Sequence, residues 1–158
     1  MVTRYVDGVT IRPLRNGDGG TVLALFDRLG PQSRAQRFGG AKPRLSDPEL
    51  ELLARVDRNH HVLVGYVDGD PQPAGIGRLA RNGRTAEIAF AVADEHQGRG
   101  IGSVLMRELA ADARAAGITE LHATIAGDNL PAVSLLRRWA QILKVRWDGG
   151  ERDFVLGL

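Results

Sequence analysis

The stretch Gln97-Gly98-Arg99-Gly100-Ile101-Gly102-Ser103 joins a predicted strand to a predicted helix and has glycine at every second position. Glycines keep side chains out of the turn, so its backbone N–H groups can converge into a concave nest for an anion. The helix that follows adds the positive end of its dipole, and Arg99 adds a charge. We therefore expect this loop to bind a phosphate or pyrophosphate. A tight turn without a ligand is the alternative interpretation.

Two other phosphate-binding loops do not fit these letters. A P-loop needs Gly-Lys followed by Ser or Thr, and no glycine of the chain is followed by lysine. A dinucleotide-binding loop is spaced G-x-G-x-x-G and belongs to a parallel strand–helix–strand unit. Here the spacing is G-x-G-x-G, and the strands before the loop are predicted to be antiparallel.

The sequence before the loop predicts an antiparallel meander of strands. Residues 61–67, 74–80 and 85–93 are rich in apolar and β-branched side chains. Turn residues separate these runs, and Asn82-Gly83 is a strong hairpin signal.

The first part of the chain is predicted to be mainly helical after one strand. Residues 9–14 predict the strand, and helical patterns follow over 22–29, 33–38 and 47–56. Ser46-x-x-Glu49 is a capping-box pattern at the start of the last of these helices.

Beyond the loop, a long helix is predicted from residue 101 to a C-cap at Gly117, because apolar residues recur there at i+4 spacing. A strand, a helix that begins at Asp128 or Asn129, and a terminal hairpin follow, at residues 121–126, 130–140, 142–147 and 153–156. The elements predict an α+β (mixed α/β) fold, with a mostly antiparallel central sheet of about seven strands flanked by about four helices. We expect residues 1–158 to form a single domain.

Composition excludes several classes of function. The 158 residues include 21 Lys and Arg, 19 Asp and Glu and no Cys, which gives a formal net charge of +2. The lack of cysteine rules out disulfides, thiolate metal sites and a cysteine nucleophile. No run of like charges predicts nucleic-acid binding, and no apolar run predicts a secretory signal or a membrane span. We expect a cytoplasmic protein without nucleic-acid or membrane partners.

The loop and its flanks resemble a known superfamily. Gln97-x-x-Gly100-x-Gly102 is similar to the Q/R-x-x-G-x-G/A pyrophosphate loop of the GNAT N-acetyltransferases. The segment 86–92 resembles the fourth strand of that fold, and Asn129-x-x-Ala132 resembles its N-x-x-A helix start. The resemblance implies the GNAT fold, acetyl-CoA as co-substrate, no metal and an amine acceptor.

A narrower resemblance is to bacterial protein lysine acetyltransferases that modify acyl-CoA synthetases. It is carried by Leu25–Leu29, Ser33, Arg37-Phe38, Leu45-Ser46, Glu49-Leu50, Val56-Asp57 and Ala86–Phe90. It implies that the acceptor is a protein lysine. A small-molecule amine acceptor and a non-catalytic acyl-CoA-binding sensor remain the alternatives. Several members of that group carry a fused cyclic-nucleotide domain, for which this chain has no room.

Glu87 is the candidate general base. A lysine amine is neutral in only about one molecule in 10³ near pH 7, so a base that takes its proton speeds the reaction. Strand alternation puts Glu87 on one face with Ala89 and Ala91, whose small side chains leave space beside the carboxylate. Related lysine acetyltransferases use a Glu on this strand. A surface-facing or ion-paired Glu is the structural alternative, and the base can act directly or through a water.

The resemblance also assigns the cofactor contacts. Backbone groups of Phe90, Ala91 and Val92 are expected to bond to the pantetheine amides, and a backbone N–H near Val92 to polarise the thioester carbonyl. The complete set of expected cofactor-binding residues is Phe90, Ala91, Val92, Gln97, Gly98, Arg99, Gly100, Ile101, Gly102, Ser103, Asn129 and Ala132. Asn129 and Ser103 have a second interpretation as helix caps.

The sequence departs from the superfamily pattern at Leu136, where many members have a tyrosine that protonates the leaving thiolate. The tyrosines of this chain, Tyr5 and Tyr66, lie outside that helix, so no general acid is assigned. A thiol with a pKa of about 8.5 can take its proton from water, which leaves catalysis feasible.

Overall fold

The computed structural model describes residues 3–38 and 42–158. Within these residues the strands form a single mixed sheet, in the order β1-β2-β3-β4-β5-β6-β8-β7. Their bounds are β1 Arg4–Val6, β2 Val9–Pro13, β3 His60–Val67, β4 Gly75–Asn82, β5 Thr85–Val92, β6 Glu120–Ala126, β7 Gln141–Asp148 and β8 Glu151–Gly157. Neighbouring strands are antiparallel except β5 and β6, which run parallel.

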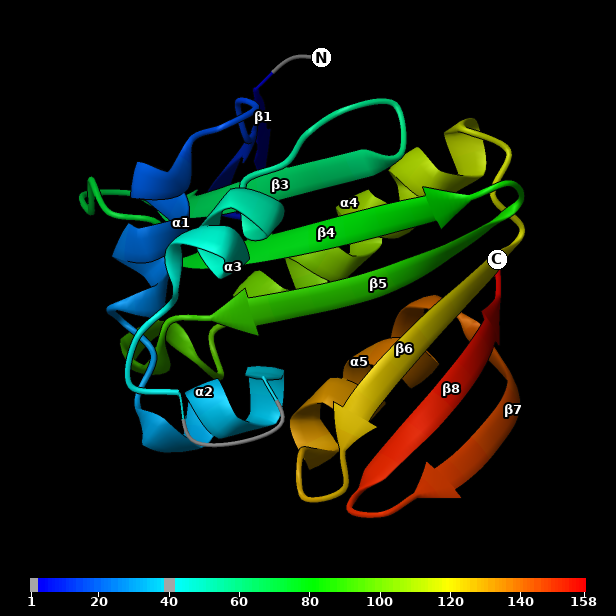
Figure 1. The fold of residues 1–158 in the computed structure, drawn as a ribbon. Helices are drawn as coiled ribbons and strands as arrows, with labels where there is room; N and C mark the ends of the chain where they lie inside the picture. Colours follow the sequence, from blue (N-terminus) through cyan, green and yellow to red (C-terminus); the bar gives the residue numbers. More distant parts are fainter. Residues whose placement is uncertain (1–2, 39–41) are drawn as a thin grey trace.

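The helices lie on both sides of this sheet (Figure 1). Their bounds are α1 Gly19–Phe26, α2 Pro31–Phe38, α3 Asp47–Leu53, α4 Ile101–Ala115 and α5 Leu130–Trp139, and a short 3₁₀ turn, η1, covers Asp94–His96. In Figure 1, α1 and α3 lie in front of β3–β5, whereas α4 and α5 lie behind the sheet. The fronts of β8 and β7 carry no helix in this view, whereas α2 lies near the ends of β5 and β6.

Local sequence signals specify the antiparallel meander of β3, β4 and β5. The Asn82–Thr85 turn joins β4 to β5 as a hairpin, and Gly83 supplies the left-handed backbone that the turn requires, with φ of 64°. The side chains of β4 then alternate between the two faces. Gly75, Gly77 and Leu79 are buried, and the two glycines lie against Ile101, Leu105 and Leu109 of α4.

The strands β5 and β6 are in register only at their beginnings. The paired residues are Thr85 with Glu120, Ala86 with Leu121 and Glu87 with His122. From Ile88 onward β5 has no paired strand on this side, while β6 continues beside β8 to Ala126. Figure 1 shows β6 turning away from β5 over this length. We call this divergence the seam between the two halves of the sheet.

Most of the buried core lies between the sheet and α4 and α5. Leu105, Met106, Leu109, Leu121 and Leu136 are fully buried there. A second, smaller cluster under α1 and α3 contains Leu14, Val22, Ala54, Val62 and Val64. No helix within residues 3–38 and 42–158 is long and apolar enough to cross a membrane.

The α+β fold predicted from the sequence is confirmed, with small differences. The described residues form one strand more than the expected seven, because the short β1 pairs with β2 in a tight N-terminal hairpin. They also form five helices, against the expected total of about four, because the short helical pattern predicted over 33–38 forms a full helix, α2. The third helix ends at Leu53 rather than near residue 56, and its predicted capping box between Ser46 and Glu49 is present.

Candidate active site

The glycine loop forms an open N-terminus on α4. Gly98 and Gly100 have φ of 76° and 84°, and a Cβ at either position would meet nothing within 4 Å. Gly100 is the N-cap of α4 and provides no side-chain cap. The first N–H groups of the helix therefore have no side-chain acceptor at the cap, and the positive end of the helix dipole is uncovered. This cradle fits a phosphate group.

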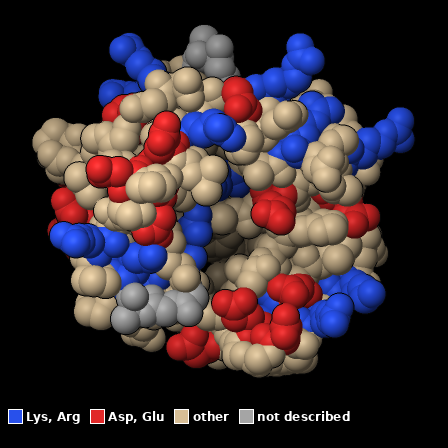
Figure 2. Space-filling view, in the orientation of Figure 1, with Lys and Arg blue, Asp and Glu red and all other residues tan. Residues whose placement is uncertain are grey.

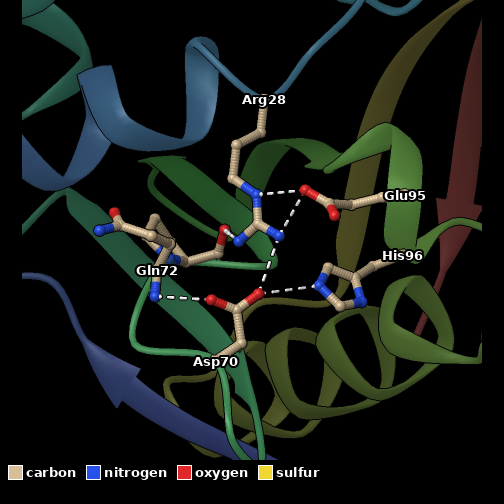
Figure 3. A network of polar contacts seen from close by, with 6 residues as sticks. Arg28, Asp70, Gln72, Glu95 and His96 are labelled. Carbon is tan, nitrogen blue, oxygen red and sulfur yellow. Dashed lines mark hydrogen bonds and ion pairs between the residues drawn. The ribbon is translucent and has the colours of Figure 1, made fainter.

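The η1 turn just before the loop is held by a network of charged groups, seen from close by in Figure 3. Arg28, which follows α1, donates from Nη2 to Asp70 Oδ2 at 2.8 Å and to Glu95 Oε1 at 2.7 Å. His96 Nε2 lies 3.1 Å from the same Asp70 oxygen, and His96 is buried. The network joins three separate segments of the chain at the base of the loop.

Asp70 is the acceptor at the centre of this network. The Gln72 N–H, the His96 ring and the Arg28 guanidinium all bond to its carboxylate and lower its pKa from 3.8 to about 2. The group is therefore ionised at neutral pH and holds both His96 and Arg28. The sequence analysis did not identify this role, because the three contacting segments are distant in the chain.

Asp94 fixes the other side of η1. Its Oδ2 accepts from the Gly30 N–H at 3.0 Å, and its Oδ1 accepts from the Ser33 hydroxyl at 2.6 Å. Gln97 donates from Nε2 to Ser33 Oγ and to Val92 O, both at 3.1 Å. The amide of Gln97 therefore ties the loop to the end of β5 and to α2, while Arg99 is exposed.

The other expected cofactor residues on helices have contacts within the protein. Asn129 caps α5, since its Oδ1 accepts from the Ala132 N–H at 3.3 Å, and Ala132 is buried. Ser103 Oγ accepts from Trp139 Nε1 at 2.9 Å, a contact that neither expected role of this serine included. Gly102 is buried, and a Cβ there would lie 3.0 Å from Leu135. Ile101 is a buried core residue.

The backbone of β5 presents alternate residues to the seam. The Ala93 N–H donates to Ala74 O on the β4 side, so Ala91 also faces β4. Phe90 and Val92 face the opposite side, where β6 has turned away. Gln97 binds the carbonyl of Val92 there, and no strand within the described residues pairs with the N–H groups of Phe90 and Val92. Of the three residues expected to bind pantetheine, the structure therefore points the backbone of two into the seam.

Glu87 is exposed at the closed end of the seam. Its register partners are Ala80 on β4 and His122 on β6. His122 is also exposed, and its Nε2 lies 2.8 Å from Glu120 Oε1. No ion pair to Glu87 occurs among the residues that the structure describes. The carboxylate is accessible from the front face.

Leu136, at the position of the superfamily tyrosine, is fully buried in the main core. Its side chain is therefore part of the packing between α5 and the sheet. An apolar core residue therefore stands where many members of the superfamily have a tyrosine.

A pocket under α1, α2 and α3 was not predicted from the sequence. Its cavity volume is about 40 Å³, and Ala89, Phe90 and Ala91 of β5 are among its lining residues. Most of its other lining is apolar, but Arg37 of α2 and Arg78 of β4 also line it. Figure 2 shows a hollow near the centre of this face, with basic side chains on one wall and acidic side chains on the opposite rim.

No group of three or more His, Asp or Glu side chains capable of holding a metal ion occurs within residues 3–38 and 42–158.

The resemblance predicted a glycine-lined helix start directly after the antiparallel meander, and the structure has it. The diverging parallel strands beside it were not predicted. Comparison with known proteins gives the same class. The chain belongs to the Acetyltransferase (GNAT) family, whose sequence pattern matches residues 24–140. The protein is therefore an acetyltransferase by family.

Two relatives and one solved structure show which acetyltransferases this chain is similar to. Acetyltransferase PA5475 of Pseudomonas aeruginosa is 33% identical over 127 residues, which cover 77% of this chain and 68% of that protein. Acetyltransferase Pat of Mycolicibacterium smegmatis is 36% identical over 132 residues, which cover 81% of this chain but 39% of Pat. The solved GNAT domain of S. lividans PAT has a TM-score of 0.84 at 24% identity and covers 95% of this chain and 90% of that one. The narrower resemblance is confirmed as similarity to Pat.

Proposed function

We propose that this chain transfers an acetyl group from acetyl-CoA to a primary amine, most readily a protein lysine, by direct attack in a ternary complex. The single observation that carries the proposal is the seam. Its unpaired backbone begins directly beside Glu87, and its other end lies at the open N-terminus of α4. The similarity to Pat over 81% of the chain supports the protein lysine as acceptor.

The parts of the site fit the parts of the co-substrate. The N–H groups at the start of α4 and the turn at Gly98 and Gly100 would hold the pyrophosphate. Phe90 and Val92 would bond to the pantetheine arm as a neighbouring strand would. Acetyl-CoA supplies the activated acetyl group.

Glu87 would take the proton that the attacking amine loses, directly or through one water. The amine nitrogen forms a bond to the carbonyl carbon as the carbon–sulfur bond breaks, and water supplies the proton of the released thiol. Leu136 is buried and cannot ionise, so this protein would use solvent as the acid.

The small-molecule amine is the second candidate acceptor, and the pocket under α1–α3 favours it. A concave, mostly apolar pocket with a few polar groups is typical of a small-ligand site. It adjoins Ala89 and Ala91, which share the front face with Glu87.

Glu87→Gln tests the mechanism. The variant keeps the shape of the side chain but removes the base, so thiol release should fall by about 10²–10⁴-fold. Calorimetric titration with CoA should give an unchanged affinity. The exposed Glu51→Gln on α3 is the matched control and should keep full activity. An unchanged rate in Glu87→Gln would remove Glu87 from the role of base, and an equal loss in the control would point to a general effect of charge.

The acceptor is decided by offering an acyl-CoA synthetase and a panel of small amines separately. Acetyl-lysine on the synthetase, with thiol release that depends on it, supports the protein acceptor. Release with amines alone would make the second candidate correct. CoA binding without turnover on any acceptor offered would favour the non-catalytic sensor.

A further inference from the structure

Two guanidinium groups line the pocket under α1–α3 with no carboxylate to balance them. Arg37 and Arg78 both face the pocket, and no described carboxylate lies within 4.0 Å of either one. Elsewhere in the described chain, Arg4, Arg28 and Arg107 do form ion pairs.

The two charges are held in an apolar setting. Phe26, Leu45 and Ile76 line the same pocket. Burial and, as the smaller effect, the nearby charge of Arg37 together lower the pKa of Arg78 to about 10. Burial also lowers the pKa of Arg37. Both groups remain protonated at neutral pH because the guanidinium is so strongly basic.

Contacts within the protein use only part of the donor capacity of this pair. Arg78 donates from Nη2 to the carbonyl of Leu53 at the end of α3. The Arg37 guanidinium lies 5.1 Å from the centre of the Phe38 ring. Arg37 and Arg78 are half-buried, and a pair of like charges shielded from water in this way favours an anion between them. A guanidinium matches the planar shape of a carboxylate.

We propose that this pocket binds a carboxylate between Arg37 and Arg78, and that the carboxylate is carried by the amine acceptor. The second part rests on the proposed function. Arg78 lies opposite Ala89 in the β4–β5 register, and Glu87 lies one alternation further along the same face. Diagonal neighbours of this kind lie about 7–8 Å apart, with their Cβ atoms somewhat closer, which is within the reach of one small molecule. The site therefore offers a base for the amine and cations for the carboxylate.

Binding is tested first, without turnover. Calorimetry with succinate and with its uncharged diamide should show saturable binding of succinate alone. Arg37→Gln should weaken succinate binding by about tenfold or more, the loss of one charge-assisted contact, and Arg37→Lys should weaken it less. The exposed Arg58→Gln is the matched control and should bind as the native protein does. Circular dichroism of each variant checks that it is folded.

Turnover then decides where the carboxylate comes from. A series of ω-amino acids of increasing length is compared with the corresponding amides, and lysine peptides with a neighbouring Glu are compared with peptides that have Gln there. We expect an acid-over-amide preference in kcat/KM of about tenfold in one of the two series, lost in Arg37→Gln. A preference among the free amino acids identifies a small acceptor, and one among the peptides identifies an acidic side chain beside the lysine.

Other results would overturn the proposal. Equal binding of succinate and its diamide, or full binding by a folded Arg37→Gln, would remove the carboxylate site. Succinate binding through Arg37 with equal use of acids and amides would overturn the assignment to the acceptor. Failure of the proposed function is distinguishable, since it would abolish thiol release with every amine and leave the succinate result unchanged.

Discussion

At the scale of single residues, the best-supported part of the site is Asp70. It is the point where the β3–β4 turn, the segment after α1 and the η1 turn meet. Each of its partners donates to or faces the carboxylate, so its ionised form is stabilised in the fold. Asp70 matters for the site because it holds η1, which leads directly into the glycine loop.

The depressed pKa of Asp70 makes stability depend on acid. The folded pKa of about 2 lies below the ordinary 3.8, so the contribution of this group is present above about pH 4 and is lost as the pH falls toward 2. Asp70→Asn should lower the melting temperature at neutral pH and reduce its fall across that acid window. Thermal melts at a series of pH values measure both effects.

The exposed Asp148→Asn is the control for this prediction, because no hydrogen bond or ion pair to its side chain occurs within the described residues. Its melting curve should match that of the native protein throughout. If the melting temperature of Asp70→Asn falls as steeply with acid as that of the native protein, other carboxylates determine the acid dependence of stability.

At the scale of elements, the start of α4 depends on a left-handed glycine. Gly100 has φ of 84° at the N-cap, a backbone conformation that costs a residue with a Cβ about 1–2 kcal/mol. Open space surrounds the position, so substitution meets no neighbouring atom. Replacing Gly100 by alanine therefore has two direct effects. It strains the backbone, and it places a methyl group in the anion cradle.

Gly100→Ala should lower both stability and CoA affinity, the affinity by about tenfold if one N–H contact to phosphate is lost. Gly83→Ala in the β4–β5 turn is a closely matched control. Its φ is 64° and a Cβ there also meets nothing within 4 Å, so the strain is similar while CoA binding should be retained. Melting curves and CoA titrations of the two variants separate strain from binding. Equal CoA affinity in both would show that the loop does not hold the phosphate.

At the scale of the whole molecule, the seam divides the sheet into a half covered by α1 and α3 and a half whose outer strands, β8 and β7, carry no helix in front (Figure 1). Helix α2 lies against both β5 and β6. The two halves are joined across the sheet by the register pairs at Thr85, Ala86 and Glu87, and behind it by α4 and α5. Backbone groups on the β5 side of the seam lack strand partners beyond these pairs.

Hydrogen exchange should detect this difference residue by residue. The amides of Phe90 and Val92 should exchange faster than those of Ala89 and Ala91, which face β4. Saturation with CoA should slow the first pair and leave the second unchanged. Residue-resolved NMR exchange makes the measurement. Equal protection of all four amides without CoA would contradict the seam.

Much of this fold could be predicted because its signals are local. The hairpin at Asn82-Gly83, the capping box at Ser46 and the i+4 pattern of α4 each lie within a few residues. The divergence of β6 from β5 has no such signal. Beyond its first residues, β6 pairs within the described part of the chain only with β8, and β8 lies between β6 and β7 although it follows both in the chain.

The same reasoning separates the predicted parts of the site from the missed ones. Gly98 and Gly100 carry their role in their own conformations, so a motif was enough to identify them. Arg37 and Arg78 line one pocket only because α2 packs against β5, the strand that pairs with β4. The sequence offered one hint of this pocket, which is that Arg78 lies among the small and apolar residues of the segment 75–80. That hint could not show that Arg37 faces the same pocket.

The seam also makes the stability of the fold depend on the concentration of a ligand bound there. A molecule that bonds to backbone along β5 and to the start of α4 can do so only when both are folded. Its binding therefore adds to the free energy of unfolding, by about 2.7 kcal/mol when its free concentration is about a hundred times its dissociation constant. Depletion of that ligand removes the same amount. The fraction of chains that is folded should then follow the concentration of that ligand.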